Sequence, residues 1–183
     1  MIPPTSSKTT PSLARSTKRP GQPVPLRETA AQPAPGSSRP GKRILLVDDD
    51  PTVRDSLSDV LVAEGYVVIP AGNGQQALEL ANRSAVDLVL LDLNMPVKNG
   101  WDTFEPLTRE HPLLPIIIIT ARPNQFFTAL SAGAGALMEK PMDIPTLLQT
   151  METLLVETGE QRLARLVGKK AEFHYKPAKA RRD

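Results

Sequence analysis

Short apolar runs recur along the middle of the chain, and each is followed by polar or turn-forming residues. They lie at residues 44–47, 66–69, 88–91, 116–119 and 136–138. Runs of this length, bounded by turn residues, are typical of strands that are buried on both faces of a sheet. The pattern therefore predicts five strands.

Between and after these runs, apolar residues recur at helical spacing. The predicted helices cover residues 52–64, 75–82, 101–109, 125–132 and 144–157. Asp50 is a suitable N-cap for the first helix, and Pro51 fits its first turn. Pro106 lies inside the third helix, which we expect to be kinked or irregular. Strands that alternate with helices predict an α/β fold: a doubly wound, five-stranded parallel sheet with five helices distributed over both faces.

Four of the predicted strands end on residues with chemically active side chains. Asp48 and Asp49 follow the first strand, Asp92 the third and Thr120 the fourth, and Lys140 comes just after the last. Because the carboxyl ends of parallel strands meet at one edge of the sheet, we expect these side chains to lie together. A single carboxylate there could be no more than a helix cap. Four such endings are hard to explain as capping.

The order and spacing of these motifs resemble the receiver domain of two-component response regulators. The matching segments are Val47-Asp48-Asp49, Asp92-Leu93-Asn94-Met95-Pro96 with Gly100, Thr120-Ala121 and Lys140-Pro141. The combination is far more specific than any one of its pieces. The chain resembles a stand-alone, chemotaxis-regulator-like receiver with N- and C-terminal extensions. This resemblance implies the flavodoxin-like strand order 2-1-3-4-5, in which the first and third strands are neighbours.

The resemblance also implies a role for three of the polar side chains. Asp92 corresponds to the phosphoacceptor, a carboxylate that attacks phosphorus and forms an acyl phosphate. Thr120 and Lys140 correspond to the hydroxyl and the ammonium group that contact the phosphoryl group. The peptide bond between Lys140 and Pro141 is expected to be cis, as in members of the family.

A cation is expected beside the acids. Carboxylates a few Å apart repel one another, and a hard cation with oxygen ligands relieves the repulsion, so Mg²⁺ is the natural choice. By resemblance, Mg²⁺ is bound by one acid of the Asp48 and Asp49 pair, by Asp92, and by the backbone carbonyl of Asn94. The other acid of the pair is then expected to hold a metal-bound water.

The function that the resemblance implies is a phosphorylation-controlled switch. A sensor histidine kinase or a phosphotransfer protein would donate the phosphoryl group, and the surface of the fourth helix, fifth strand and fifth helix would change. Many members carry Tyr or Phe three residues before the Lys, where this chain has Leu137, and an aliphatic side chain cannot make the same ring movement. Phe126 and Phe127 are adjacent in a predicted helix, so one of them is expected at the surface, available to a protein partner.

Charge is segregated along the chain, although the net formal charge is only +2. Residues 1–43 hold eight Lys or Arg and one Glu. Residues 44–158 hold six basic and sixteen acidic residues, and residues 159–183 hold eight basic and three acidic residues. The middle of the chain is therefore acidic, which suits a cation as ligand.

The composition divides the chain into three parts. Residues 1–41 are rich in Pro and Ser and are interpreted as a disordered basic arm, residues 42–158 as the receiver domain, and residues 159–183 as a basic C-terminal tail. The arm is interpreted first as a solubilising segment, next as a basic arm that touches nucleic acid or another polyanion, and last as a transit peptide. The tail is expected to be solvated, with a possible short helix at residues 160–167.

Composition also excludes several classes of protein. The chain has no Cys, so it has no disulfide and no thiolate chemistry. Its apolar runs are far shorter than the roughly 20 residues of a membrane-spanning helix, and its N-terminus lacks the apolar core of a secretory signal. We therefore expect a cytoplasmic protein with no membrane partner. Apart from self-phosphorylation on Asp92, we expect no enzymatic activity.

Two other functions fit parts of the sequence. One is a receiver fold that serves as a phosphorylation-independent binding module through its basic tails, which would bind nucleic acid only weakly. Its output would be unchanged by the substitution Asp92→Ala. The other is a small-molecule phosphatase that uses the acid cluster. This class usually needs a second acid two residues after its nucleophile, and position 94 is Asn.

Overall fold

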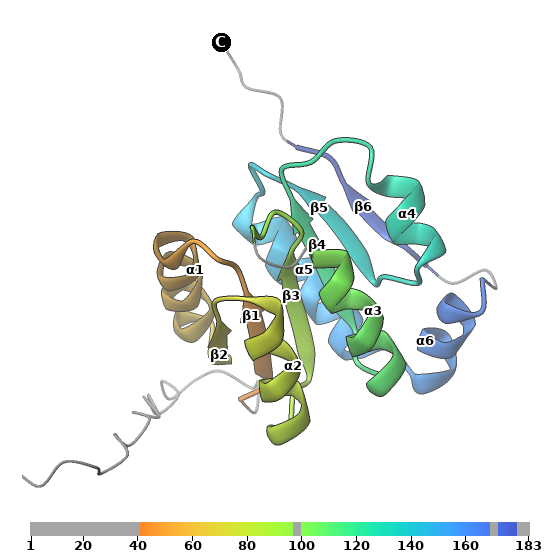
Figure 1. The fold of residues 1–183 in the computed structure, drawn as a ribbon, viewed down its shortest axis with the longest axis horizontal. Helices are drawn as coiled ribbons and strands as arrows, with labels where there is room; N and C mark the ends of the chain where they lie inside the picture. Colours follow the sequence, from red (N-terminus) through yellow and green to blue (C-terminus); the bar gives the residue numbers. More distant parts are fainter. Residues whose placement is uncertain (1–40, 97–99, 169–171, 179–183) are drawn as a thin grey trace, which may run out of the picture. The chain divides into compact units, whose positions relative to one another are not determined.

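The computed structural model describes residues 41–96, 100–168 and 172–178. Its strands form one parallel sheet in the order β2-β1-β3-β4-β5-β6 (Figure 1). The strands are β1 (Arg43–Val47), β2 (Val67–Ala71), β3 (Leu88–Asp92), β4 (Ile116–Thr120), β5 (Ala136–Glu139) and β6 (His174–Lys176). The helices are α1 (Pro51–Ala63), α2 (Gly74–Arg83), α3 (Gly100–Glu110), α4 (Phe126–Ser131), α5 (Ile144–Leu155) and α6 (Gly159–Leu166).

The α/β class and the order of the first five strands agree with the prediction, but the predicted number of elements is too small. The structure has six strands and six helices among its described residues, not five of each. The additional elements both lie in the predicted tail: α6 coincides with the short helix considered at residues 160–167, whereas β6 was not expected. β6 has three residues, too few for a periodic pattern, and it exists through pairing with β5, which is distant in sequence.

Two apolar layers cover the two faces of the sheet. One contains side chains of α2, α3 and α4, among them Ala77, Phe104 and Ala129. The other contains side chains of α1 and α5, among them Leu61 and Leu147. Every residue of β3 and β4 is buried. Burial of apolar surface stabilises the folded state by about 25 cal/mol per Å². The buried core therefore keeps the central strands, and with them their carboxyl ends, in fixed register.

The start of α1 follows the prediction from the sequence. The side chain of Asp50 accepts hydrogen bonds from the backbone N–H groups of Thr52 at 2.8 Å and Val53 at 3.4 Å, and Pro51 is the first helical residue. These bonds satisfy N–H groups that have no partner within the helix. In α3, the helix continues through Pro106 without interruption.

The C-terminal segment packs against the domain. Thr158 and Gln161 form a capping box at the start of α6, each side chain accepting a hydrogen bond from the other residue's backbone N–H. Arg165 of α6 is buried and forms two hydrogen bonds with the carboxylate of Glu157, at 2.8 and 2.6 Å. This ion pair fixes α6 to the end of α5.

The predicted disordered arm, residues 1–41, lies outside the described residues except for Gly41. Parts of the predicted tail, residues 169–171 and 179–183, lie outside them as well. In the part of the chain that the structure describes, no helix is both long enough and apolar enough to cross a membrane.

Candidate functional site

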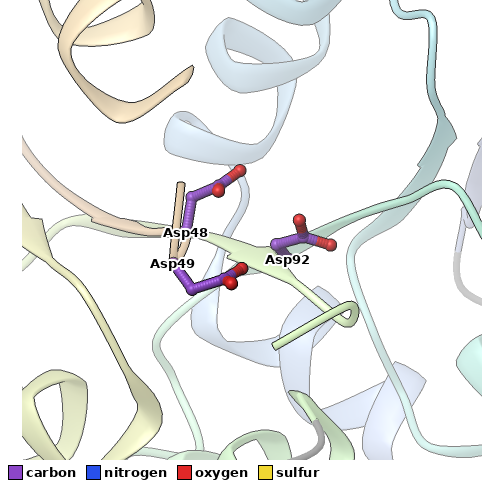
Figure 2. Close-up of side chains that lie close together, drawn as sticks. All are labelled: Asp48, Asp49 and Asp92. Atoms are coloured by element: carbon purple, nitrogen blue, oxygen red, sulfur yellow. The ribbon is translucent and has the colours of Figure 1, made fainter. Parts of the chain in front are cut away.

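Three carboxylates meet at the carboxyl edge of the sheet. Asp92 is the last residue of β3, and Asp48 and Asp49 directly follow β1, its neighbour in the sheet. One side-chain oxygen from each of the three lies within 4.8 Å of the others. Figure 2 shows the three carboxylates from the two strand ends, gathered around one space. The strand order thus places together acids that are 43 residues apart in the sequence.

The three acids differ in exposure. Asp48 is 5% exposed and Asp92 is 4% exposed, whereas Asp49 is more exposed. Each buried carboxylate accepts a hydrogen bond from the backbone two residues later: Asp48 from the N–H of Asp50 at 2.9 Å, and Asp92 from the N–H of Asn94 at 2.8 Å. A buried charge is tolerated only when it is hydrogen-bonded and paired. The turns after β1 and β3 supply part of that requirement.

Lys140 provides the neutralising charge. Its ammonium Nζ lies 2.6 Å from Oδ2 of Asp92 and 3.0 Å from Oδ2 of Asp48. Burial by itself would lower the pKa of Lys140, but its hydrogen bonds to Asp92 and Asp48 and the attraction of both charges outweigh burial and raise that pKa above its ordinary value. The peptide bond between Lys140 and Pro141 is cis, as expected. Lys140 is therefore a permanent cation between the two buried acids at neutral pH.

Thr120 ends β4 at the same edge. It is fully buried, and it lies one residue beyond Ile119, the register partner of Asp92. Its Oγ1 accepts a hydrogen bond from the backbone N–H of Arg122 at 2.9 Å. The hydroxyl proton remains able to donate to another oxygen.

The turn after β3 is closely packed. A Cβ atom on Gly100 would lie 2.5 Å from the backbone oxygen of Asp92 and 2.6 Å from Cα of Leu93. The N–H of Gly100 also donates to the carbonyl of Leu93 at 3.3 Å. The start of α3 therefore presses directly on the backbone that carries Asp92. Residues 97–99 of this loop lie outside the described residues.

The donor set fits a hard divalent cation. Asp48, Asp49 and Asp92 offer carboxylate oxygens within one coordination sphere, and oxygen is the ligand type that Mg²⁺ and Ca²⁺ prefer. Lys140 engages one oxygen of Asp48 and one of Asp92, so it leaves other lone pairs of the cluster available. The fourth predicted ligand is the backbone carbonyl of Asn94. Asn94 lies next to the acids, since its backbone N–H donates to the carboxylate of Asp92.

One contact at the site was missed at the level of sequence. Nη1 of Arg54, in α1, donates to the backbone carbonyl of Asp48 at 2.6 Å. The guanidinium group of Arg54 thus stabilises the turn that carries Asp48 and Asp49. The sequence signal that could have indicated this contact is the position of Arg54 in the first turn of the helix after the acidic run.

The region around β5 combines an expected feature with an unexpected one. Phe127 of α4 is 77% exposed while Phe126 is only partly exposed, as their adjacency predicts. Leu137, the residue that departs from the family pattern, is fully buried. Its register partner on β6 is Tyr175, whose ring packs edge-on against the ring of Phe126 at 5.0 Å between centroids.

Comparison with known proteins identifies the middle of the chain. A family model described as the response regulator receiver domain matches residues 44–152. The transcriptional regulatory protein CpxR of Escherichia coli is 40% identical over 115 residues, which cover 62% of this chain and 49% of CpxR. The probable transcriptional regulatory protein TcrX of Mycobacterium tuberculosis is 33% identical over 118 residues, which cover 63% of this chain and 50% of TcrX. The chain thus spans about half the length of these relatives.

Solved structures give the same result for the fold. A CheY-like response regulator receiver domain protein from Methanospirillum hungatei superimposes with a TM-score of 0.60 at 31% identity, covering 63% of this chain and 94% of that one. The response regulator TrrA from Thermotoga maritima, solved in complex with Mg²⁺ and BeF, superimposes with a TM-score of 0.58 at 32% identity and covers 62% of this chain and 98% of its own. The family match at residues 44–152 includes Asp48, Asp49, Asp92 and Lys140.

Proposed function

Because this chain belongs to the response regulator receiver domain family, we propose that it is a phosphorylation-controlled switch whose phosphoacceptor is Asp92. The observation that carries the proposal is the contact of Lys140 with both buried acids, 2.6 Å from Asp92 and 3.0 Å from Asp48. Asp92 lies at a strand end, beside the ammonium group of Lys140 and the strand-end residues Asp48 and Thr120. A cation and a hydroxyl group in these positions can stabilise an incoming anion.

The proposed reaction is transfer of a phosphoryl group from a phosphohistidine. A carboxylate oxygen of Asp92 attacks the phosphorus atom, a P–O bond forms, and the P–N bond to the imidazole breaks. The electron pair of that bond leaves with the imidazole nitrogen, and Asp92 becomes an acyl phosphate. Since phosphoryl transfer requires mainly positioning and charge stabilisation, few groups are needed beyond those at this edge.

Two side chains of the chain stabilise the transferred group. The ammonium group of Lys140, which its two acids keep protonated, can bond to the oxygens of the transferred phosphoryl group. The hydroxyl of Thr120, at the end of β4, can donate a hydrogen bond to a phosphoryl oxygen. Both roles are electrostatic, and both come from rigid strand ends rather than from flexible loops.

The residues that would hold Mg²⁺ are Asp48, Asp49, Asp92 and the backbone carbonyl of Asn94. When bound, Mg²⁺ would neutralise the acids and the phosphoryl oxygens, which lets two anions approach each other. The different exposure of the first two acids suggests how they divide the work. Buried Asp48 already bonds Lys140, whereas the more exposed Asp49 is free of that contact and can turn toward a hydrated cation.

The proposed partners follow from the chemistry. The phosphoryl donor is a sensor histidine kinase or a phosphotransfer protein, and the output is a protein that recognises the changed surface. The matched relatives are named as transcriptional regulators, so a contact of the basic ends with DNA is a further possibility for the output. The phosphorylation-independent alternative is not favoured, because three acids and Lys140 meet at the edge where a phosphoacceptor would lie.

The test is incubation of the purified chain with a small acyl phosphate donor, with and without Mg²⁺, followed by intact mass. We expect a mass gain of one phosphoryl group that requires Mg²⁺ and is abolished in Asp92→Ala. Asp102→Ala, which removes an acid in the first turn of α3 outside the cluster, is the matched control and should still be modified. Equal modification of the wild type and Asp92→Ala would reject Asp92 as the acceptor.

A further inference from the structure

The C-terminal strand β6 covers the edge of β5, which would otherwise end the sheet. It pairs parallel to β5, with His174, Tyr175 and Lys176 opposite residues 136–138. An uncovered strand edge presents unpaired backbone groups that another chain can bind. In this chain, that edge is occupied by a segment of its own sequence.

Aromatic rings form the second part of the contact. Phe126 of α4 packs edge-on against Phe173 at 5.6 Å and against Tyr175 at 5.0 Å between ring centroids. Phe126 is thereby covered, while its neighbour Phe127 remains exposed. The β6 segment therefore hides both a strand edge and an aromatic surface of α4.

Glu139 links β6 to the acidic site. Its Oε1 accepts a hydrogen bond from the hydroxyl of Tyr175 at 2.9 Å, and its Oε2 accepts one from the backbone N–H of Ala178 at 3.2 Å. Glu139 precedes Lys140 in sequence and is the register partner of Thr120. Glu139, which holds the end of β6, therefore lies next to both Lys140 and Thr120, the two residues that are expected to contact the phosphoryl group.

The contact between β6 and β5 is small enough to break reversibly. β6 has only three residues, none of them fully buried, and the N–H of His174 reaches the carbonyl of Gly135 at a long 3.3 Å. Segments with few buried contacts open at low free energy. By contrast, the buried Arg165 pairs with Glu157, so α6 stays anchored when β6 moves, and its bond to the carbonyl of Glu172 at 3.1 Å holds only the start of the segment that leads into β6.

We propose that β6 is an intramolecular cover whose docking on β5 is coupled to the acidic site, and that a phosphoryl group on Asp92 releases it. The proposal rests on the function proposed above. Phosphoryl oxygens on Asp92 replace the carboxylates as partners of Lys140 and attract the hydroxyl of Thr120, the end of β5 shifts with Lys140, and Glu139 no longer holds Tyr175 and Ala178 together. Release uncovers the β5 edge and Phe126 for a protein partner, so the C-terminal segment supplies the coupling that Leu137 cannot.

The test uses a reversible covalent lock in the full chain. Ala136→Cys and His174→Cys place thiols on register partners of β5 and β6, and the natural chain has no Cys, so oxidation at low protein concentration favours a disulfide between these two positions, and disulfide-linked dimers are removed by gel filtration. Binding of beryllofluoride, a non-covalent mimic of a phosphoryl group, is measured with Mg²⁺ through the fluorescence of Trp101, the single Trp. Coupling is reciprocal, so a lock on β6 must weaken binding at Asp92.

We expect beryllofluoride to bind the oxidised double variant at least about 5-fold more weakly than the same protein after reduction, a typical lower bound for coupled sites. Wild-type chain treated with the oxidant is the control and should not change. Equal affinity in the oxidised and reduced forms would overturn the proposal while leaving Asp92 as acceptor. No binding to the wild type would instead reject the proposed function itself.

Two further measurements do not depend on the double variant folding. Tyr175→Phe keeps the ring but removes the hydrogen bond to Glu139, so β6 should detach more easily and beryllofluoride should bind more tightly than to the wild type. Amide hydrogen exchange in the wild type should rise at residues 172–178 when beryllofluoride is added, but not in α6. Unchanged affinity together with unchanged exchange would contradict the coupling.

Discussion

Lys140 joins the ends of three strands through one side chain. It follows β5 in sequence and bonds Asp92, at the end of β3, and Asp48, just after β1. A cation in this place stabilises the site by neutralising two buried acids. As a positive charge beside the same acids, it also disfavours the binding of a metal ion there.

The substitution Lys140→Ala should therefore have opposite effects on metal binding and on phosphorylation. Mg²⁺ should bind more tightly, because the competing cation is gone, whereas phosphoryl transfer should slow by on the order of 100-fold, because a fixed charge that stabilises the reacting group is lost. Titration of Mg²⁺ against Trp101 fluorescence and the time course of intact mass measure the two effects. Lys42→Ala is a matched control, since Lys42 forms a similar pair with Asp87, 2.9 Å apart, at the opposite edge of the sheet. Weaker Mg²⁺ binding in Lys140→Ala would contradict this view of the site.

Asp87 makes the stability of the fold depend on acid pH. Burial by itself would raise the pKa of Asp87, but the hydrogen bonds from the backbone N–H of Arg43 and from Lys42 outweigh it and lower that pKa. A lowered pKa in the folded state means that the ionised carboxylate stabilises the fold above the ordinary pKa of 3.8 and that this contribution is lost as the pH falls below it.

Asp87→Asn should consequently be less stable than the wild type near neutral pH by about 1 kcal/mol, a value reduced for the partial exposure of the pair. The difference should shrink as the pH falls below 3.8, through the lowered pKa of Asp87. Urea denaturation at several pH values measures it. Parallel stability curves for the two proteins would show that this carboxylate does not contribute as described.

The main site residues could be predicted from sequence because strand ends converge whatever the details of packing. Asp48, Asp92 and Lys140 needed only correct strands and strand order. Contacts made by long side chains could not be predicted in the same way. The reach of Arg54 to the carbonyl of Asp48 depends on the angle between α1 and the sheet, which no local pattern encodes.

At the scale of elements, the start of α3 sets the position of the phosphoacceptor. Gly100→Ala would bring a Cβ atom against the backbone of Asp92 and Leu93 at 2.5 and 2.6 Å, and backbone atoms cannot move aside cheaply. We expect a loss of roughly 1–3 kcal/mol in the free energy of unfolding, as for overpacked cores, together with slower phosphorylation.

Gly72→Ala provides the comparison for this change, measured by urea denaturation and by intact mass. Its added Cβ would have the guanidinium of Arg54 as nearest neighbour, at an ordinary 3.5 Å. It should stay within about 0.5 kcal/mol of the wild type, as is usual for surface substitutions. If Gly100→Ala behaved like Gly72→Ala, the close packing of α3 on the acid-bearing turn would not matter for the site.

The elements differ in how far local sequence determines them. The first five helices and the first five strands were predicted within two residues at most boundaries, because their apolar spacing is set by the core that they cover. The helix predicted at residues 160–167 is α6 (Gly159–Leu166). β6 could not be predicted, because its three residues pair with a strand that lies far back in the sequence. Its proposed role as a cover likewise depends on this pairing.

At the scale of the whole molecule, charge and chemistry are separated. The acidic middle of the chain holds the site, and the two ends carry the excess of Lys and Arg. The family match covers residues 44–152 and stops before α6 and β6. The residues of the acidic site therefore fall within the family match, whereas α6 and β6 lie outside it.

The most direct test of the central claim is to locate the phosphoryl group after reaction with a small acyl phosphate donor and Mg²⁺. Brief digestion with pepsin in acid and mass spectrometry would identify the modified peptide. Our account predicts that the added mass lies on the peptide containing Asp92 and that neutral hydroxylamine removes it, because an acyl phosphate is a mixed anhydride. A modification on any other peptide, or one that survives hydroxylamine, would contradict the account.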